Sequence, residues 1–367
     1  MRGEPVSSDR GPEVQVSATP ELGPADVIPK PRRRFFPHIH RLRGIAIIGV
    51  VSIHVISVLG LPLPVWAEVP YDVVFGEGSP IFLMISGFLF REGLAKYAYP
   101  RFIDRKVRNV LIPYLVVSIP ALVIYLGGFK TSHPWLSEDF FDRNPVVQTV
   151  VLLVTGAHLG PLWFIPMILL FFIVSPVFVY MDRHPRTYLV LPLLFVVTVL
   201  VPRPYENSDP IQSFVHFLSL FVLGMWLARN HDRLIDWYQQ RRATVLGLGL
   251  VLVVVLAVIA LDVPSVDSLM RGAFGTLLVF VLYTWRDLGR PGIWLDKLGE
   301  ASFPVFFLHG YPVAVLRALV PEDVAIGPWT WLALWLPLTF GIAAGTAAFA
   351  FAVRRLLGKR SRYLVGL

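Results

Sequence analysis

The stretch "HRLRGIAIIGVVSIHV" at residues 40–55 places Arg43 at the start and His54 in the middle of a segment apolar enough to cross a membrane. On a helix, Arg43 and His54 would lie about 20° apart around the axis and about 16 Å apart along it. An ionisable side chain at that depth costs about 2–3 kcal/mol, so we expect both residues to face one polar cavity with a function. The alternative is a neutral histidine that is hydrogen-bonded to a neighbouring helix.

The composition is that of a membrane protein. Of the 367 residues, 55% are hydrophobic and 16% are charged, whereas soluble domains have about 25% charged residues. Several nearly uncharged stretches reach the length of about 18 residues that spans a bilayer. The sequence therefore predicts an all-α polytopic membrane protein, a bundle of about ten transmembrane helices around a polar cavity.

The predicted spans cover about 43–60, 78–95, 109–127, 162–181, 187–201, 211–228, 243–261, 268–285, 301–319 and 329–353. The apolar run at 144–161 is short for a crossing, and we interpret it as a half-span or re-entrant piece packed against protein. Prolines within many spans free helix carbonyls, which favours a bundle with a wet cavity. The segment "GIAAG" at 341–345 is typical of a helix-packing face.

Basic residues predict the orientation. The net charge of +8 could suggest a nucleic-acid partner, but the basic residues lie between apolar segments, so we expect none. With both termini cytoplasmic in an inner (plasma) membrane, all but five of the 33 Lys and Arg fall inside. Residues 1–36 are expected to form a disordered cytoplasmic tail, 37–356 the transmembrane domain, and 357–367 a basic cytoplasmic tail. The five exceptions are Lys130, Arg143, Arg203, Arg271, which could pair with Asp267, and Arg317.

Two further motifs lie in spans two and three. "SPIFLMISGFLF" at 79–90 contains Ser86, which we assign to helix packing in preference to a nucleophile, since no base stands near it in sequence. "RFIDRKVRNVLIPY" at 101–114 places Arg101, Arg105 and Arg108 on one helix face. A row of guanidinium groups suits phosphate oxygens, although anchoring to anionic lipid is the alternative.

Later motifs add aromatic and imidazole groups. Trp163 in "GPLWFIPMI" (160–168) fits an interfacial aromatic belt, with stacking on a sugar ring as the other interpretation. "ASFPVFFLHGYP" (301–312) places a second intramembrane imidazole, His309, in span nine. The sequence has no cysteine, which excludes a thiolate nucleophile, and no metal-binding motif, so no metal is expected.

Taken in order, these motifs resemble the acyltransferase 3 family of integral-membrane acyltransferases over about residues 38–355. The resemblance rests on "LRGIAIIGVVSIH", "IFLMISGFLF", "RKVRNVLIPY", "LWFIPMI", "FLSLFVLGMWLA" and "ASFPVFFLHGYP". It departs where the family has a tyrosine near the late histidine, because Phe306 and Phe307 stand here.

The resemblance implies transfer of a short acyl group, usually acetyl from acetyl-CoA, to a hydroxyl of a carbohydrate or natural product. It implies that His54 and Arg43 are essential and that Arg105 and Arg108 meet the donor. A general-base histidine would accept the proton of the acceptor hydroxyl. The alternative is a polysaccharide or glycolipid exporter, since mid-membrane ionisable residues and broken helices also suit a substrate path.

Overall fold

The computed structural model describes residues 3, 34–60, 65–285, 288–320 and 327–367. Contacts separate Met1–Phe35 from Phe36–Leu367, and the second unit, over its described residues, consists of helices without a strand. Seven described helices are long and apolar enough to cross a bilayer, or nine if each of two bent helix pairs forms one span. The predicted all-α polytopic membrane fold is confirmed.

Most predicted spans fall on a straight or nearly straight helical segment. These are α1 (Pro37–Leu59), α2 with α3 (Val65–Phe75, Ser79–Glu92), α4 with η2 and α5 (Tyr99–Lys106, Val107–Leu111, Ile112–Leu126), α10 (Pro210–Arg229), α12 (Arg242–Asp262), α13 (Val266–Thr284) and α16 (Pro328–Leu357).

Three predicted spans take a different form. The apolar run at 144–161 contains α6 (Pro145–Thr155), which is bent by 74° against the segment of η4 (Gly160–Trp163) and α7 (Phe164–Ile173), where the fourth predicted span begins, a geometry that fits either a broken span or a re-entrant loop. The ninth span is α14 (Gly289–Leu308) followed at 56° by α15 (Gly310–Leu319). The fifth span falls on η5 (Pro185–Val190) and α9 (Leu191–Leu200), which is shorter than the seven long helices. The remaining α-helices of the described residues are α8 (Ser175–Arg183), α11 (His231–Gln240) and α17 (Ser361–Val365).

We distinguish the two ends of the bundle. The basic end is the one where α1 begins, and the cavity end is the one where α1 finishes and where the cavity described below opens. At the basic end, where α1 begins, Arg41 pairs with Asp296 of α14 and the ring of His38 stacks on His231 of α11. At the cavity end, where α1 finishes, the Gly60 carbonyl accepts a hydrogen bond from the Trp331 indole of α16. α1 therefore runs between the two ends and fixes the depth of Arg43 and His54.

Helices α3 and α10 cross at glycines. A Cβ atom on Gly87 would lie 1.9 Å from the Phe221 carbonyl oxygen, and one on Gly224 would lie 1.8 Å from that of Met84. Both obstacles are backbone atoms, so only glycine permits this approach. The Ser-Gly pair of the second span is thus a packing position.

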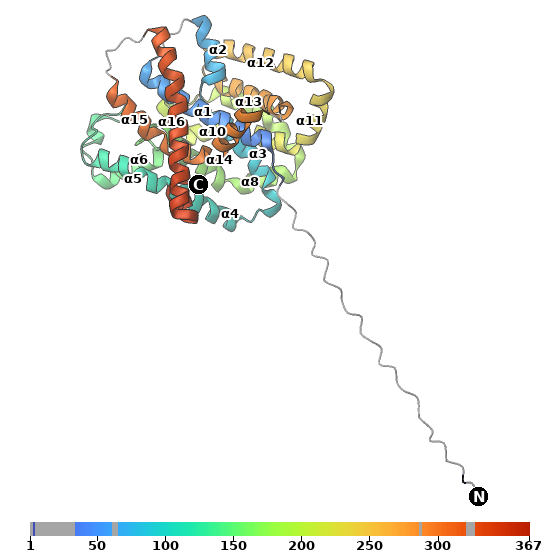
Figure 1. The fold of residues 1–367 in the computed structure, drawn as a ribbon, viewed down its shortest axis with the longest axis horizontal. Helices are drawn as coiled ribbons and strands as arrows, with labels where there is room; N and C mark the ends of the chain where they lie inside the picture. Colours follow the sequence, from blue (N-terminus) through green and yellow to red (C-terminus); the bar gives the residue numbers. More distant parts are fainter. Residues whose placement is uncertain (1–2, 4–33, 61–64, 286–287, 321–326) are drawn as a thin grey trace. The chain divides into compact units, whose positions relative to one another are not determined.

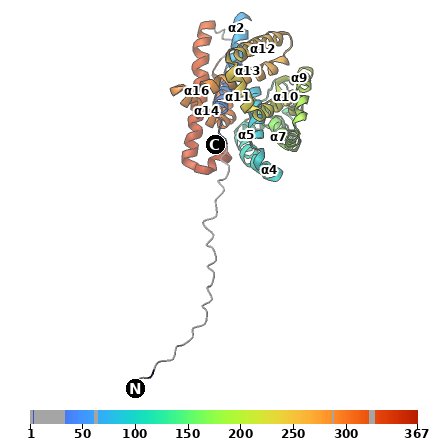
Figure 2. The ribbon, with the colours of Figure 1, turned by 90° about the vertical axis from the view of Figure 1, so that its right-hand side faces the viewer.

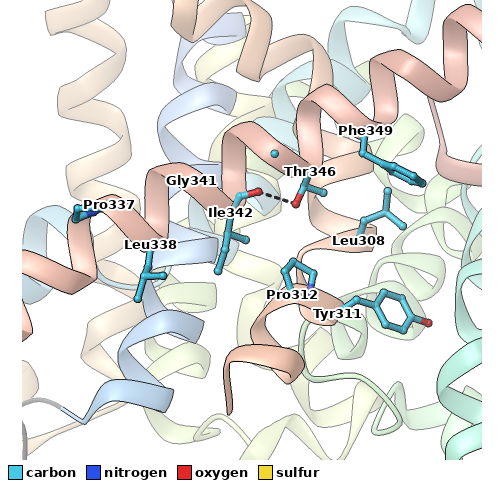
Figure 3. Close-up of a pocket in the computed structure, with 10 residues that line it drawn as sticks. Leu308, Tyr311, Pro312, Pro337, Leu338, Gly341, Ile342, Thr346 and Phe349 are labelled. Atoms are coloured by element: carbon cyan, nitrogen blue, oxygen red, sulfur yellow. Dashed lines mark hydrogen bonds between the residues drawn. The ribbon is translucent and has the colours of Figure 1, made fainter. Parts of the chain in front are cut away.

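Helix α16 runs along one side of the bundle, as both views show (Figures 1 and 2). Gly341 and Gly345 of "GIAAG" meet no atom within 4 Å of an added Cβ, so the expectation of a close helix contact there is wrong. They instead line an apolar groove of about 580 Å³, which Leu308 and Tyr311 border from α14 and α15 (Figure 3). Beyond α16, α17 packs back on the bundle, with Ser361 and Val365 buried.

Candidate active site

A cavity of about 560 Å³ opens beside His54 at the cavity end. Its lining is drawn from α1, the segment before α3, the end of α5 and the segment that follows it, the bend between α6 and η4, the α9–α10 connection and α15. Segments distant in sequence therefore enclose the imidazole of His54. We call this space the His54 cavity.

His54 presents a free imidazole to this cavity. The residue is half-buried, and its ring forms no hydrogen bond with the residues that the structure describes. Gly160 lies against it: a Cβ there would be 3.6 Å from Cε1 of the ring. The ring nitrogens thus remain available to a hydroxyl group that enters the cavity.

His309 lies beside His54, with 5.3 Å between the ring centroids. It occupies the break between α14 and α15, where Pro312 has no N–H to donate to the preceding turn. Its Nδ1–H donates to the Val305 carbonyl at 2.8 Å, so in the neutral ring Nε2 is an acceptor. That Nε2 is buried and has no partner among the described residues.

Like His54, Arg43 of α1 lies against α14, but it contacts an earlier turn of that helix. Its Nη2 donates to the Ser302 hydroxyl at 2.8 Å. The approach is close because α1 and α14 meet at glycines: a Cβ on Gly44 would lie 2.6 Å from the Leu295 carbonyl oxygen. No carboxylate among the described residues pairs with Arg43.

The shared polar space expected between Arg43 and His54 is not open. Between them on α1, Ile47, Val50 and Val51 are exposed by only 0%, 1% and 0%. Arg43 contacts Ser302 of α14 and His54 contacts His309 at the end of α14, but packed aliphatic side chains fill the interval between them. The His54 cavity opens towards the cavity end, away from Arg43.

The arginine row of the third span is exposed and does not reach His54 in this structure. Arg105 Nε donates to the Arg101 carbonyl at 3.2 Å, and Arg108 pairs with Asp104 at 2.8 Å. Arg108 lies in η2, a π-helical turn that changes the phase of the side chains after Lys106. The contacts of Arg105 with Arg101 and of Arg108 with Asp104 both join residues four positions apart, one helical turn.

Ser86 and Trp163 are placed differently from each other. The Ser86 hydroxyl donates to the Phe82 carbonyl one turn earlier at 2.8 Å, a common helical arrangement. Trp163 lines the His54 cavity but is only 7% exposed. The Arg203 guanidinium covers its ring at 4.9 Å from the centroid, and Phe217 stacks on it as well.

Several cavity residues were missed in the sequence, and they are charged. Arg203 forms two hydrogen bonds with the carboxylate of Glu77, which joins the α9–α10 connection to the start of α3. Lys130 and Arg317 also line the cavity. The sequence predicted five bases for this end, and three of them, Lys130, Arg203 and Arg317, line the cavity. Their common predicted side was the signal that could have identified them. Arg271 belongs to a neighbouring cavity and pairs with Asp267 at 3.1 Å, as the spacing suggested.

Two groups in the segment after α5 have altered acidity. Burial, and then the nearby Arg317, lower the pKa of Lys130. Burial lowers the pKa of His133 to about 4, with Lys130 adding to the effect and a hydrogen bond to the Ala157 carbonyl opposing it. His133 is therefore neutral at pH 7. Within the described residues, no group of three or more His, Cys, Asp or Glu side chains could hold a metal.

Comparison with known proteins gives consistent results. The acyltransferase 3 family model, described as an acyltransferase domain, matches residues 37–353. The succinoglycan biosynthesis protein ExoH of Rhizobium meliloti (strain 1021) is 30% identical over 274 residues, which are 67% of this chain and 67% of that protein. No solved structure matches the chain.

Proposed function

The chain belongs to the acyltransferase 3 family of membrane acyltransferases, and from that premise we propose that it transfers an acetyl group from acetyl-CoA to a hydroxyl of a cell-envelope saccharide. The observation that carries the proposal is the half-buried, unbonded imidazole of His54 in a cavity of about 560 Å³. The similarity to a protein of succinoglycan biosynthesis supports a saccharide as the acceptor.

In this reaction a ring nitrogen of His54 accepts the proton of the acceptor hydroxyl. The hydroxyl oxygen attacks the thioester carbonyl, the new C–O bond forms, the C–S bond breaks, and the coenzyme A thiolate leaves and takes up a proton. His309 accepts a hydrogen bond from the His54 imidazolium through its unpartnered Nε2. General-base catalysis of this kind contributes roughly 10²–10⁴ in rate.

The donor enters from the basic end. Arg43 is a cation inside the bundle without a carboxylate partner among the described residues, which suits an anionic or strongly polarised donor group. Arg101, Arg105 and Arg108 are exposed to meet the phosphates of the coenzyme. Because Ile47, Val50 and Val51 fill the interval, the pantetheine arm has to displace their packing to bring the thioester to His54.

The cavity end then faces outward and the basic end faces the cytoplasm, with both termini on the cytoplasmic side of the inner membrane. This orientation follows the positive-inside rule. The acceptor accordingly reaches His54 from the outside, and the donor from the inside.

The test is His54→Asn, which keeps a polar side chain of similar size without a base. We expect transfer of labelled acetyl from acetyl-CoA to envelope saccharides to fall roughly 10²–10⁴-fold. His184→Asn is the matched control, because that histidine is exposed and lies outside the cavity lining. A His54→Asn protein that folds and transfers acetyl at the normal rate would refute this assignment.

A further inference from the structure

Two cations of the His54 cavity have no carboxylate partner. Lys130 and Arg317 line the cavity, and neither forms an ion pair with a carboxylate of the described residues. The third cation, Arg203, is neutralised by Glu77. Arg317 Nη2 donates to the Ser57 hydroxyl at 3.0 Å, and the Lys130 ammonium lies 5.1 Å from the Tyr125 ring centre. These contacts leave most of their N–H donors unused.

The surrounding polar groups are also incompletely bonded. The Tyr125 side chain lines the cavity and is only 4% exposed, yet its hydroxyl has no hydrogen-bond partner among the described residues. His133 lines the same wall, and its Nε2–H donates to the Ala157 carbonyl. In the neutral ring its Nδ1 is therefore an acceptor, and it is likewise buried without a described partner. Unpartnered buried polar atoms are costly, so their gathering beside two unpaired cations indicates a ligand.

Membrane anchoring does not explain these cations. Anchoring bases gather on the side where positive residues are abundant, whereas Lys130 and Arg317 are among the few at the cavity end. Both side chains are exposed, and the charge of Arg317 acts on Lys130, so an anion between or beside them would relieve the repulsion of two like charges. Glu206, the remaining carboxylate of the lining, is exposed and pairs with neither.

The position of Arg317 relative to His54 indicates the size of the ligand that could reach both. The Ser57 hydroxyl donates to the His54 carbonyl at 2.9 Å and also receives the Arg317 guanidinium. Ser57 follows His54, the residue at which transfer occurs, by three positions, which is about 4.5 Å along the helix axis, and the Arg317 guanidinium lies 3.0 Å from its hydroxyl. A single sugar unit spans such an interval.

We propose that Lys130, Arg317 and Tyr125 form an anion-binding subsite, beside which the neutral His133 accepts a hydrogen bond from a sugar hydroxyl, and that the acceptor is an acidic saccharide. Its carboxylate or phosphate group binds this subsite while a hydroxyl of the same or the adjacent sugar lies at His54. Trp135, which packs edge-on against His133 and lines the cavity, offers an aromatic surface to the sugar. The inference rests on the proposed function, because it takes His54 as the place of transfer.

The experiment measures binding of defined probes to the full-length purified protein. The nitrophenyl glucuronide and the nitrophenyl glucoside differ only by a carboxylate in place of a hydroxymethyl group, and a phosphorylated glucoside supplies the phosphate arm. We expect at least one acidic probe to bind roughly tenfold tighter than the neutral one, since charge-assisted hydrogen bonds are the stronger class. The preference should shrink as ionic strength rises. Equal affinity for all three probes would overturn the proposal.

Variants locate the subsite. Lys130→Gln and Arg317→Gln should each lose most of the acid preference, whereas Lys130→Arg should keep it. The matched control is Arg143→Gln, because Arg143 is exposed in the same connecting segment but is absent from the cavity lining. An acid preference that survives both glutamine variants in folded protein would also overturn the proposal.

Acetyl transfer is measured separately on the same preparations. His54→Asn should keep the acid preference while losing transfer. A wild-type protein that prefers acidic probes but transfers no acetyl group would refute the proposed function and leave the anion subsite standing. A wild-type protein that transfers acetyl but shows no acid preference would refute the subsite alone.

Discussion

Arg43 is held inside the bundle by one hydroxyl group, that of Ser302. Lysine at this position would keep the charge but lose the planar fork of donors. If Arg43 binds the donor, we expect Arg43→Lys to lower kcat/KM for acetyl-CoA about tenfold or more. The KM for the acceptor should stay unchanged, because the His54 cavity opens away from Arg43. Steady-state kinetics with each substrate varied in turn measure the two effects.

Arg41→Lys provides the control for this prediction. Arg41 precedes Arg43 by two positions on α1, but its guanidinium pairs with Asp296 at 3.1 Å. A lysine can preserve that ion pair, so transfer should be normal. The donor role of Arg43 is contradicted if Arg43→Lys raises the acceptor KM alone.

Among single residues, the sequence identified those whose ionisable side chains are energetically unfavourable in an apolar span. Arg43 and His54 were recognised because an ionisable group in an apolar span calls for an explanation. Lys130, Tyr125 and Arg317 were not recognised, because each is ordinary in its local sequence. Their common role is visible only when the end of α5, the segment after it and the end of α15 meet at one cavity. Such tertiary convergence leaves no periodic signal in a single chain.

Helices α3 and α10 depend on glycine where they cross. Gly87→Ala would place a Cβ 1.9 Å from a backbone carbonyl oxygen, and the two helices would have to separate. Overpacking of this kind costs about 1–3 kcal/mol. We expect a lower thermal unfolding midpoint for Gly87→Ala in detergent, followed by tryptophan fluorescence.

Gly345→Ala is the matched control, because an added Cβ there meets no atom within 4 Å. Alanine favours helix over glycine by up to about 1 kcal/mol, so this variant should be as stable as wild type or more so. A larger loss of stability in Gly345→Ala than in Gly87→Ala would contradict the assignment of the close helix contact to the α3–α10 crossing and would place a contact at the groove beside α16.

The sequence largely predicted which segments form spans, but it did not predict where the helices contain irregular turns. Hydropathy located α1, α10, α12 and α13 because length and apolar content decide a span. It could not place the π-helical turn at Val107–Leu111, between α4 and α5. The packing of "GIAAG" was mistaken for a related reason: small residues permit a close contact, but whether a partner arrives depends on the neighbouring helix.

For the whole molecule, two unequal ends are the organising feature. Bases are abundant where α1 begins and scarce where it finishes, and the His54 cavity lies at the scarce end. The sequence predicted this asymmetry from loop charges alone. It did not predict that the space between Arg43 and His54 is filled, because side-chain packing between α1 and α14 is a tertiary property. If the donor reaches His54 from the basic end, as proposed, the catalytic cycle requires an opening movement at Ile47 and Val51, which are packed in this structure.

The orientation of the two ends can be tested cleanly, because the natural sequence contains no cysteine. A single cysteine at Arg143, exposed at the cavity end, should react with a membrane-impermeant maleimide in intact cells. A single cysteine at Lys359, exposed beyond α16, should react only after the membrane is permeabilised. Both variants should retain acetyl transfer, because neither residue lies in the cavity lining. The reverse labelling pattern would place the His54 cavity on the cytoplasmic side, so that donor and acceptor would have to exchange their entrances.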